Sequence, residues 1–191
     1  MSLLTACCAM LAGCAHLDYP AEWAPPAPTT ERCADLSGNY AEDGTGRAAR
    51  LIGQAPDEFH VKLSYLFLTI KSPDATHLSL AGPKDGHLDV SLWQGKRWLD
   101  SRTLSEGQNY RCEAGIIVIT TGDSGSDITS SGAVVTVAIK RTSRLVKARD
   151  GALLIHQNAS GGAGLFFVPF VPVADEAWDR FVSLPAPEHQ P

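Results

Sequence analysis

The fold is decided by residues 76–93, which read THLSLAGPKDGHLDVSLW. Apolar and polar residues alternate before Pro83 and again after Gly86, which is the period of a strand with one buried face. Between the two runs, Asp85-Gly86 supplies the positive φ that a tight connection between antiparallel strands needs. This stretch therefore predicts a β-hairpin.

Further strands are predicted along the chain. Asp150-Gly151 marks a second hairpin, and the apolar runs that predict strands are 98–104, 110–121, 133–141, 146–149, 153–156 and 165–168. With 17 glycines and 12 prolines, the chain is expected to be all-β, an antiparallel meander closed into a barrel or folded as a sandwich. One or two short helices fit this fold: residues 60–70 suit a strand or a helix, and Asp175 can cap a helix through 178–181.

Length and composition narrow the class of protein. The 191 residues suit one domain. A composition of 44% hydrophobic and 19% charged residues excludes a disordered chain. A net charge of −5 argues against a nucleic-acid-binding protein, which would carry a basic face. No apolar run reaches the roughly 20 residues of a membrane-spanning helix.

The first residues predict export. Residues 1–13 carry no charge and are mostly apolar, and they lead into Leu11-Ala12-Gly13-Cys14. This sequence resembles the lipobox of bacterial lipoproteins, in which an apolar residue and two small residues precede a cysteine. The resemblance implies that 1–13 are a signal peptide and that Cys14 is lipidated and anchors the protein to a membrane. Because Ala15 and not aspartate follows the cysteine, it also implies the outer membrane, facing the periplasm.

Three regions are expected after the signal peptide. Residues 14–33 contain four prolines and form a Pro-rich tether, in which we expect Trp23 to be solvated. Residues 34–184 form the β domain, and 185–191 form a disordered tail.

The cysteines support an oxidising compartment. Once Cys7 and Cys8 leave with the signal peptide and Cys14 is lipidated, Cys33 and Cys112 remain, and they can form one disulfide. Two unpaired buried thiols are the alternative. We expect no metal and no cofactor, because no CxxC or HxxxH spacing occurs.

Several short motifs along the domain are similar to those of uncharacterised bacterial envelope lipoproteins. These are Cys33, Ser37-Gly38-Asn39-Tyr40, Tyr110-Arg111-Cys112, Asp150-Gly151 and Trp178-Asp179-Arg180-Phe181. The resemblance spans most of the domain and implies no known activity.

One motif suggests catalysis. Gly122-Asp123-Ser124-Gly125 resembles the nucleophile segment of trypsin-like proteases, but Ser126 stands where a glycine would follow. A serine nucleophile needs a histidine base, for which His77 and His156 are open candidates. We expect a flexible loop at 122–132 and no catalytic residues, with a serine hydrolase using Ser124 as an alternative. Calcium binding by Asp123 and Asp127 is disfavoured because the spacing of an EF-hand is absent. The glycine-rich stretch 160–164 lacks a P-loop lysine and is expected to be a turn.

Two features suggest binding. One is a basic patch toward an anionic surface such as lipid head groups, with a solvated hairpin face as the alternative; it comprises Lys140, Arg141, Arg144, Lys147 and Arg149. The other is a set of aromatic residues that would line a lipocalin-like cavity or fill a core: Trp93, Trp98, Tyr110 and Phe166. We therefore expect a lipid-anchored, non-enzymatic protein that binds a small apolar ligand or an envelope partner. Since Ser37-Gly38 and Tyr40 are similar to a motif of periplasmic lysozyme inhibitors, inhibition of such an enzyme is the alternative.

Overall fold

The computed structural model describes residues 18–48, 57–68, 72–128, 134–165 and 171–185. Within these ranges, only the backbone is described for 57, 123–128, 134–137, 162–165 and 171–174. The predicted all-β class is confirmed, because the strands form two antiparallel sheets and the described residues contain one short helix, α1 (Ser64–Phe67).

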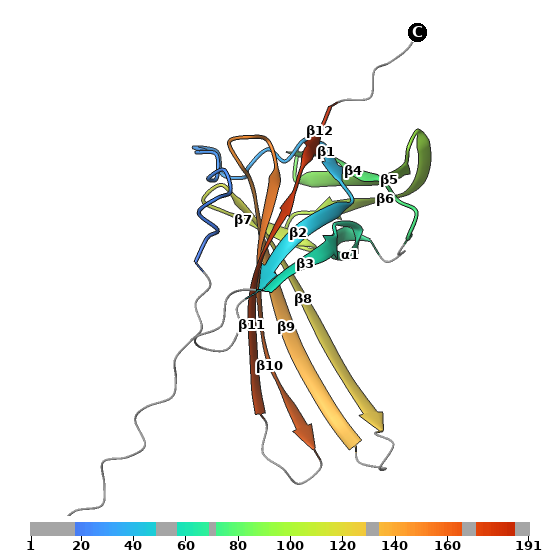
Figure 1. The fold of residues 1–191 in the computed structure, drawn as a ribbon, viewed down its shortest axis with the longest axis vertical. Coiled ribbons are helices and arrows are strands. Elements are labelled where there is room, and N and C mark those ends of the chain that lie inside the picture. The colour runs from blue at the N-terminus through green and yellow to red at the C-terminus, as the bar shows by residue number, and fades with distance from the viewer. Residues whose placement is uncertain (1–17, 49–56, 69–71, 129–133, 166–170, 186–191) are drawn as a thin grey trace, which may run out of the picture.

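A five-stranded sheet and a seven-stranded sheet make up the fold (Figure 1). The five-stranded sheet has the order β12 (Ser183–Leu184), β1 (Gly38–Ala41), β4 (His77–Lys84), β5 (His87–Gln94), β6 (Arg97–Ser105). The seven-stranded sheet has the order β3 (Asp57–Lys62), β2 (Asp43–Ala48), β11 (Val171–Phe181), β10 (Leu153–Leu165), β9 (Val134–Lys147), β8 (Ile116–Ile128), β7 (Tyr110–Glu113).

The hairpin at 76–93 is confirmed as β4 and β5. Leu78 pairs with Leu92 and Leu80 with Val90, and all four side chains are buried. Gly86 in the connection has a φ of +77°, which is the left-handed conformation that the hairpin predicts.

The core lies between the two sheets. The seven-stranded sheet contributes Ile155, Leu145 and Ile117 from three neighbouring strands, and the five-stranded sheet contributes the hairpin leucines. The sheets do not close into a barrel, so of the two predicted forms the sandwich is the one observed. Because successive residues of a strand face opposite sides, the neighbours of these core residues, such as Leu154, Val146 and Ile116, lie on the outer face of the seven-stranded sheet.

Two expectations for the segments outside the hairpins need correction. The helix expected after Asp175 is wrong: the segment is the end of β11, where pairing with β10 and β2 satisfies its backbone groups on both sides. Of residues 60–70, the described part, 60–68, contains the end of β3, which runs to Lys62, and the helical turn α1, which begins at Ser64.

The glycine-rich stretches also differ from expectation. Residues 160–164 lie inside β10 and residues 122–128 inside β8, so neither is a loop. Both are held by ladder pairing with β9, which continues unbroken from Val134 to Lys147 where the sequence predicts two separate strands. Of the strand predicted at 165–168, only Leu165 falls within the described residues, as the last residue of β10.

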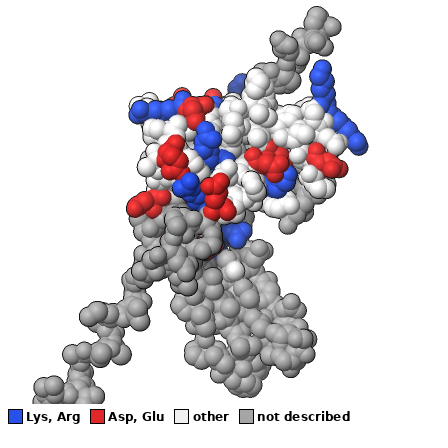
Figure 2. Space-filling view, viewed as in Figure 1, with Lys and Arg blue, Asp and Glu red and all other residues white. Residues whose placement is uncertain are grey.

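The four strands β8 to β11 extend beyond the sandwich (Figure 1). β7 pairs only with residues 116–119 of β8, and β2 pairs only with residues 177–180 of β11. Within the described chain, the remaining parts of β8 and β11 therefore each pair with a neighbouring strand on one side only. On the face shown in Figure 2, positive and negative side chains are interspersed over the sandwich. Among the described residues there is no helix with the length and apolar character to cross a membrane.

Candidate functional site

Residues 18–35, here called the strap, lie against the outer face of the seven-stranded sheet. Pro26 forms an isolated antiparallel bridge with Ala148, and the Ala27 amide donates to the Lys147 carbonyl at 2.8 Å. The amide of Arg149 donates in turn to the Pro25 carbonyl at 3.0 Å. The segment expected to be a free tether is thus hydrogen-bonded to the hairpin between β9 and β10.

Aromatic rings hold the first part of the strap. Tyr19 contacts Trp178 of β11 edge-on, with ring centroids 5.0 Å apart, and contacts Trp23 in the same manner at 6.3 Å. Trp23 packs against a small buried cluster that includes Ala152 and Leu154. The prediction that Trp23 is solvated is therefore wrong, because the outer face of the sheet offers it an apolar surface.

The second part of the strap is covalently attached. Cys33 and Cys112 of β7 form a disulfide with Cα atoms 5.1 Å apart, which is the pairing that the cysteine count predicts. Beside it, the Arg32 guanidinium forms a two-pronged ion pair with Glu106. The carboxylate of Glu106 lies close to both sulfur atoms, but the disulfide leaves neither of them as a thiolate for a metal.

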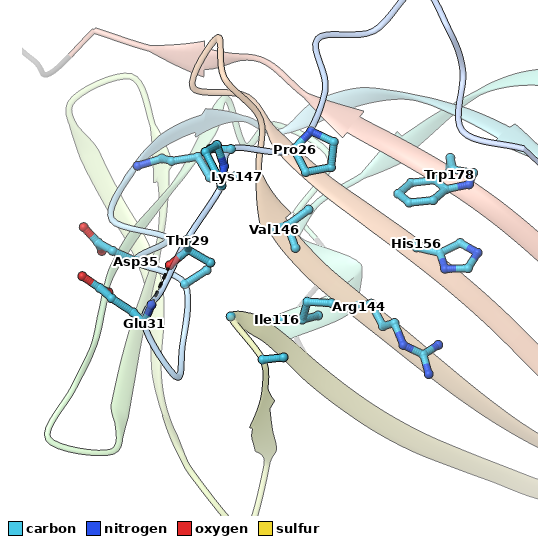
Figure 3. Close-up of a pocket in the computed structure, with 15 residues that line it drawn as sticks. Pro26, Thr29, Glu31, Asp35, Ile116, Arg144, Val146, Lys147, His156 and Trp178 are labelled. Atoms are coloured by element: carbon cyan, nitrogen blue, oxygen red, sulfur yellow. Dashed lines mark hydrogen bonds between the residues drawn. The ribbon is translucent and has the colours of Figure 1, made fainter.

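Between the strap and the sheet is a cavity of about 570 Å³ (Figure 3). Its strap wall is largely formed by Pro26, Ala27, Pro28 and Thr29, and its sheet wall by Ile116, Arg144, Val146, His156 and Trp178. The volume lies within the range of about 300–1,000 Å³ that is typical of small-molecule sites.

One end of the cavity combines a cation with two stacked rings. Strand register places Arg144 between Val118 and His156, and His156 opposite Trp178, all on the outer face. The His156 imidazole stacks on the Trp178 indole with centroids 4.4 Å apart, and its Nε2 donates to Glu176 Oε1 at 2.6 Å. The stacking and the hydrogen bond together fix the orientation of the imidazole.

The opposite end of the cavity carries carboxylates, as Figure 3 shows for Glu31 and Asp35. Hydrogen bonds from Ser37 hold the pKa of Asp35 below its usual range, so this carboxylate is ionised at neutral pH. The Lys147 amine lies at the same end, where it donates to the Ser37 carbonyl at 2.7 Å. The cavity therefore has the Arg144 guanidinium at one end and the carboxylates of Glu31 and Asp35 beside the Lys147 amine at the other end. Between the two ends its walls are apolar.

Two further carboxylates are buried away from this cavity. Burial raises the pKa of Asp179 to about 6, and within the described chain only its Oδ2 has a hydrogen-bond donor, from Gln157. Glu42 accepts hydrogen bonds from both the amide and the hydroxyl of Ser64 at the start of α1, and its pKa is also raised by burial. Glu42 has a structural role, since it fastens the single helical turn to the sheet.

The predicted basic patch does not form one surface. Lys140 and Arg144 lie on the outer face of β9, and alternation along the strand puts Arg141 on the opposite face. Lys147, the last residue of β9, lines the cavity at the end away from Arg144. Arg149 lies in the turn after β9. The five basic residues are therefore distributed over both faces of β9 and the following turn, and of the five only Arg144 and Lys147 line the cavity.

The predicted aromatic set does not line a common cavity either. Trp93 stacks on His77 in the five-stranded sheet, Trp98 is 55% exposed, and Tyr110 is buried in the core. Phe166 lies outside the described residues. Of the three described members of the set, Tyr110 is the one that fills the core.

The serine motif lies far from the histidine of the cavity. The side chains of Asp123, Ser124 and Asp127 are not described, but the β8 register places Ser124 six residues beyond Val118, which is level with His156. At about 3.3 Å per residue this separates the two by about 20 Å, so His156 cannot act as the base for Ser124.

Cys14 lies outside the described residues.

Sequence reasoning misses most of the cavity. Of its residues, the sequence singles out Arg144, Lys147 and His156 for other roles and Trp178 only as part of a motif. Cross-strand neighbours cannot be read from local alternation. The aromatic residues Tyr19 and Trp23 in a proline-rich segment are the signal that indicates docking onto the domain.

The structure therefore defines a two-sheet sandwich with a strapped outer cavity. No family model, curated protein or solved structure matches this chain. Its function is accordingly inferred from the cavity and the residues that line it.

Proposed function

We propose that this chain is a lipid-anchored protein of the bacterial cell envelope that binds a small apolar ligand in the cavity beneath the strap, without catalysis. The observation that carries the proposal is the cavity itself, whose middle is walled by apolar residues of both the strap and the sheet. Pro26, Val146 and Ile116 offer a hydrocarbon ligand a surface that excludes water.

The position of the cavity supports a ligand of membrane origin. Asp18, where the described strap starts, is four positions after Cys14, a distance of at most about 14 Å along the chain. An acyl chain on Cys14 would hold the strap close to the membrane surface, so that a lipid-derived ligand has a short path to the cavity. The disulfide between Cys33 and Cys112 is consistent with an oxidising compartment such as the periplasm.

Catalysis is disfavoured by geometry. Trp178 and Glu176 hold the only histidine that lines the cavity in the described chain, and no serine or cysteine thiol is among the lining residues. The alternative of a lysozyme-type inhibitor is also less favoured, because Tyr40 of its motif is fully buried and donates its hydroxyl to the Leu36 carbonyl at 2.8 Å. Such a residue has no surface to offer an enzyme.

Binding can be tested with a polarity-sensitive apolar dye and a filled cavity. In the full chain carrying Cys14→Ser, which has no attached acyl chain, we expect saturable dye fluorescence at one site per molecule. Ile116→Trp should abolish it by filling the cavity. Thr120→Trp is the matched control, since it adds the same ring to the same face of β8 at an exposed position outside the cavity. Equal dye binding by the two variants would contradict the proposal.

The anchor is tested separately by intact mass of protein produced in a Gram-negative host. A chain that starts at Cys14 and carries acyl groups supports the proposal, and membrane fractionation then assigns it to the inner or outer membrane. An unmodified Cys14 would refute the lipid anchor. The proposal that the cavity binds an apolar ligand would then be decided by the dye experiment alone.

A further inference from the structure

One arginine that lines the cavity, Arg144, has no carboxylate partner among the described residues. Three arginines in the described chain are half-buried, namely Arg47, Arg144 and Arg180. Arg47 forms ion pairs with Glu22 and Glu58, and Arg180 forms one with Asp150 at 2.6 Å. Among the described residues, no carboxylate lies within ion-pair distance of Arg144. A partly desolvated guanidinium without an anion is energetically unfavourable, and binding of an anion there relieves that cost.

The surroundings of Arg144 suit recognition of an anion. Its neighbours across the strands are Val118 and His156, both held by packing, and the nearby carboxylate of Glu176 already accepts a hydrogen bond from His156. Arg144 lies next to Ile116 at one end of the cavity, and its guanidinium points away from the apolar side chains (Figure 3). A planar guanidinium can donate two parallel hydrogen bonds to a carboxylate or a phosphate.

The other end of the cavity sets the direction of the ligand. Glu31 and Asp35 line that end together with Lys147, whose amine donates to the Ser37 carbonyl and lies near Asp35. Two carboxylates outnumber this one amine, so that end is less favourable for an anionic group than the end at Arg144. An anionic ligand is thus favoured with its charged group at Arg144 and its apolar part along Val146, Ile116 and Pro26.

We infer, on the basis of the proposed function, that the ligand is a single-chain anionic amphiphile whose carboxylate or phosphate group binds the Arg144 guanidinium. Free fatty acids and lysophospholipid-type phosphates share this chemistry. The charge complementarity of the cavity favours both over neutral or cationic amphiphiles of the same chain length.

The test uses four amphiphiles with one decyl chain and different head groups: carboxylate, phosphate monoester, alcohol and trimethylammonium. Each displaces the apolar dye from the full chain carrying Cys14→Ser. We expect the better of the two anions to bind at least tenfold more tightly than the alcohol, since hydrogen bonds to charged groups are strong. Which anion binds more tightly distinguishes the fatty-acid source from the phosphate source.

Variants assign the effect to Arg144. Arg144→Gln should bind the anions no more tightly than the same variant binds the alcohol, and Arg144→Lys should retain part of the preference. Arg141→Gln is the matched control, because it removes the same charge from an exposed position on the opposite face of β9 and should keep the full preference.

The outcomes separate this inference from the proposed function. The inference is overturned if the protein with unchanged Arg144 binds the anions and the alcohol equally, or binds the trimethylammonium compound most tightly. The proposed binding of an apolar ligand would stand in both cases. An anion preference that survives Arg144→Gln also overturns it. Displacement by none of the four amphiphiles refutes the proposed function and the inference with it.

Discussion

The imidazole of His156 lies nearly parallel to the indole of Trp178, with ring centroids 4.4 Å apart and planes inclined by 16°. The two residues are directly opposite each other on β10 and β11. Tyr19 of the strap contacts the same indole edge-on, so Trp178 is both a wall of the cavity and an anchor for the strap that covers it. The docking of the first part of the strap onto the sheet thus depends on a small number of aromatic contacts.

Tyr19→Ala should loosen the strap without unfolding the domain. The Tyr19 ring contacts two tryptophans, and its hydroxyl donates to the Ala24 carbonyl at 2.6 Å. We expect the amides of Trp23 and Ala27 to exchange hydrogen at least about tenfold faster, which corresponds to about 1.4 kcal/mol of lost local stability. Amides of β5 in the other sheet serve as the internal reference. Unchanged exchange at both strap amides would show that the aromatic contacts do not hold it.

Removal of the disulfide should destabilise the whole domain. Cys33 and Cys112 are 79 residues apart, and the chain-entropy model gives about 4 kcal/mol for a loop of that length. The double variant Cys33→Ser/Cys112→Ser should therefore show a lower urea midpoint than the oxidised protein. Reducing agent should lower the midpoint of the unchanged chain by a similar amount and have no effect on the variant. A variant as stable as the oxidised protein contradicts this prediction.

Stability should fall as the pH rises between about 4 and about 6. Burial raises the pKa of Asp179 from 3.8 to about 6, so over this interval the unfolded chain releases a proton that the folded chain keeps. The free energy of unfolding then decreases with pH, and the shift corresponds to at most about 3 kcal/mol. Glu42, whose pKa is also raised by burial, contributes with the same sign. Asp35 has the opposite sign, because its lowered pKa gives stability that is lost as the pH falls below about 4.

Asp179→Asn isolates the contribution of that carboxyl group. The amide keeps the shape of the side chain and its contact with Gln157, but it does not ionise. We expect the variant to lose most of the decrease between pH 4 and 6 and to be more stable than the parent at pH 7. Urea midpoints measured at several pH values check this, and an unaltered pH profile would rule out Asp179 as its source.

Gly46→Ala should be destabilising for steric reasons. A Cβ at this position of β2 would overlap the Phe59 ring of β3 and lie 2.7 Å from Asp179 Oδ1. Both neighbours are held by the sheet, so we expect a loss of about 1–3 kcal/mol, as is usual for overpacking. Gly122→Ala is the control, since that glycine is also in a strand but a Cβ added there would meet no atom within 4 Å beyond its chain neighbours. Equal thermal stability of the two variants would contradict the steric account.

The sequence by itself determined the class of fold and the two tight hairpins. Alternation along 76–93 and the positive φ at Gly86 involve residues that are close in the chain, so local rules are sufficient to predict them. The cysteine count predicted the bridge between Cys33 and Cys112, since only these two remain if residues 1–13 are removed and Cys14 is lipidated as expected, and the structure confirms the bridge. The local preference of Asp175 for a helix cap led to the wrong prediction of a helix at this position. A helix cap depends on a few neighbours in the sequence, whereas β11 forms through eleven register pairs with β10.

Only the tertiary structure decided that the strap lies on the outer face, that it encloses a cavity, and that Arg144 lines this cavity with no carboxylate partner among the described residues. These features join the strap to β8, β9, β10 and β11, and they depend on which side of the sheet each residue occupies. A shift of one residue in register would move every side chain of a strand to the other face. Long-range pairing fixes that register. The contacts of the strap's aromatic rings with the sheet are also long-range, so the composition of the strap alone predicted a free tether.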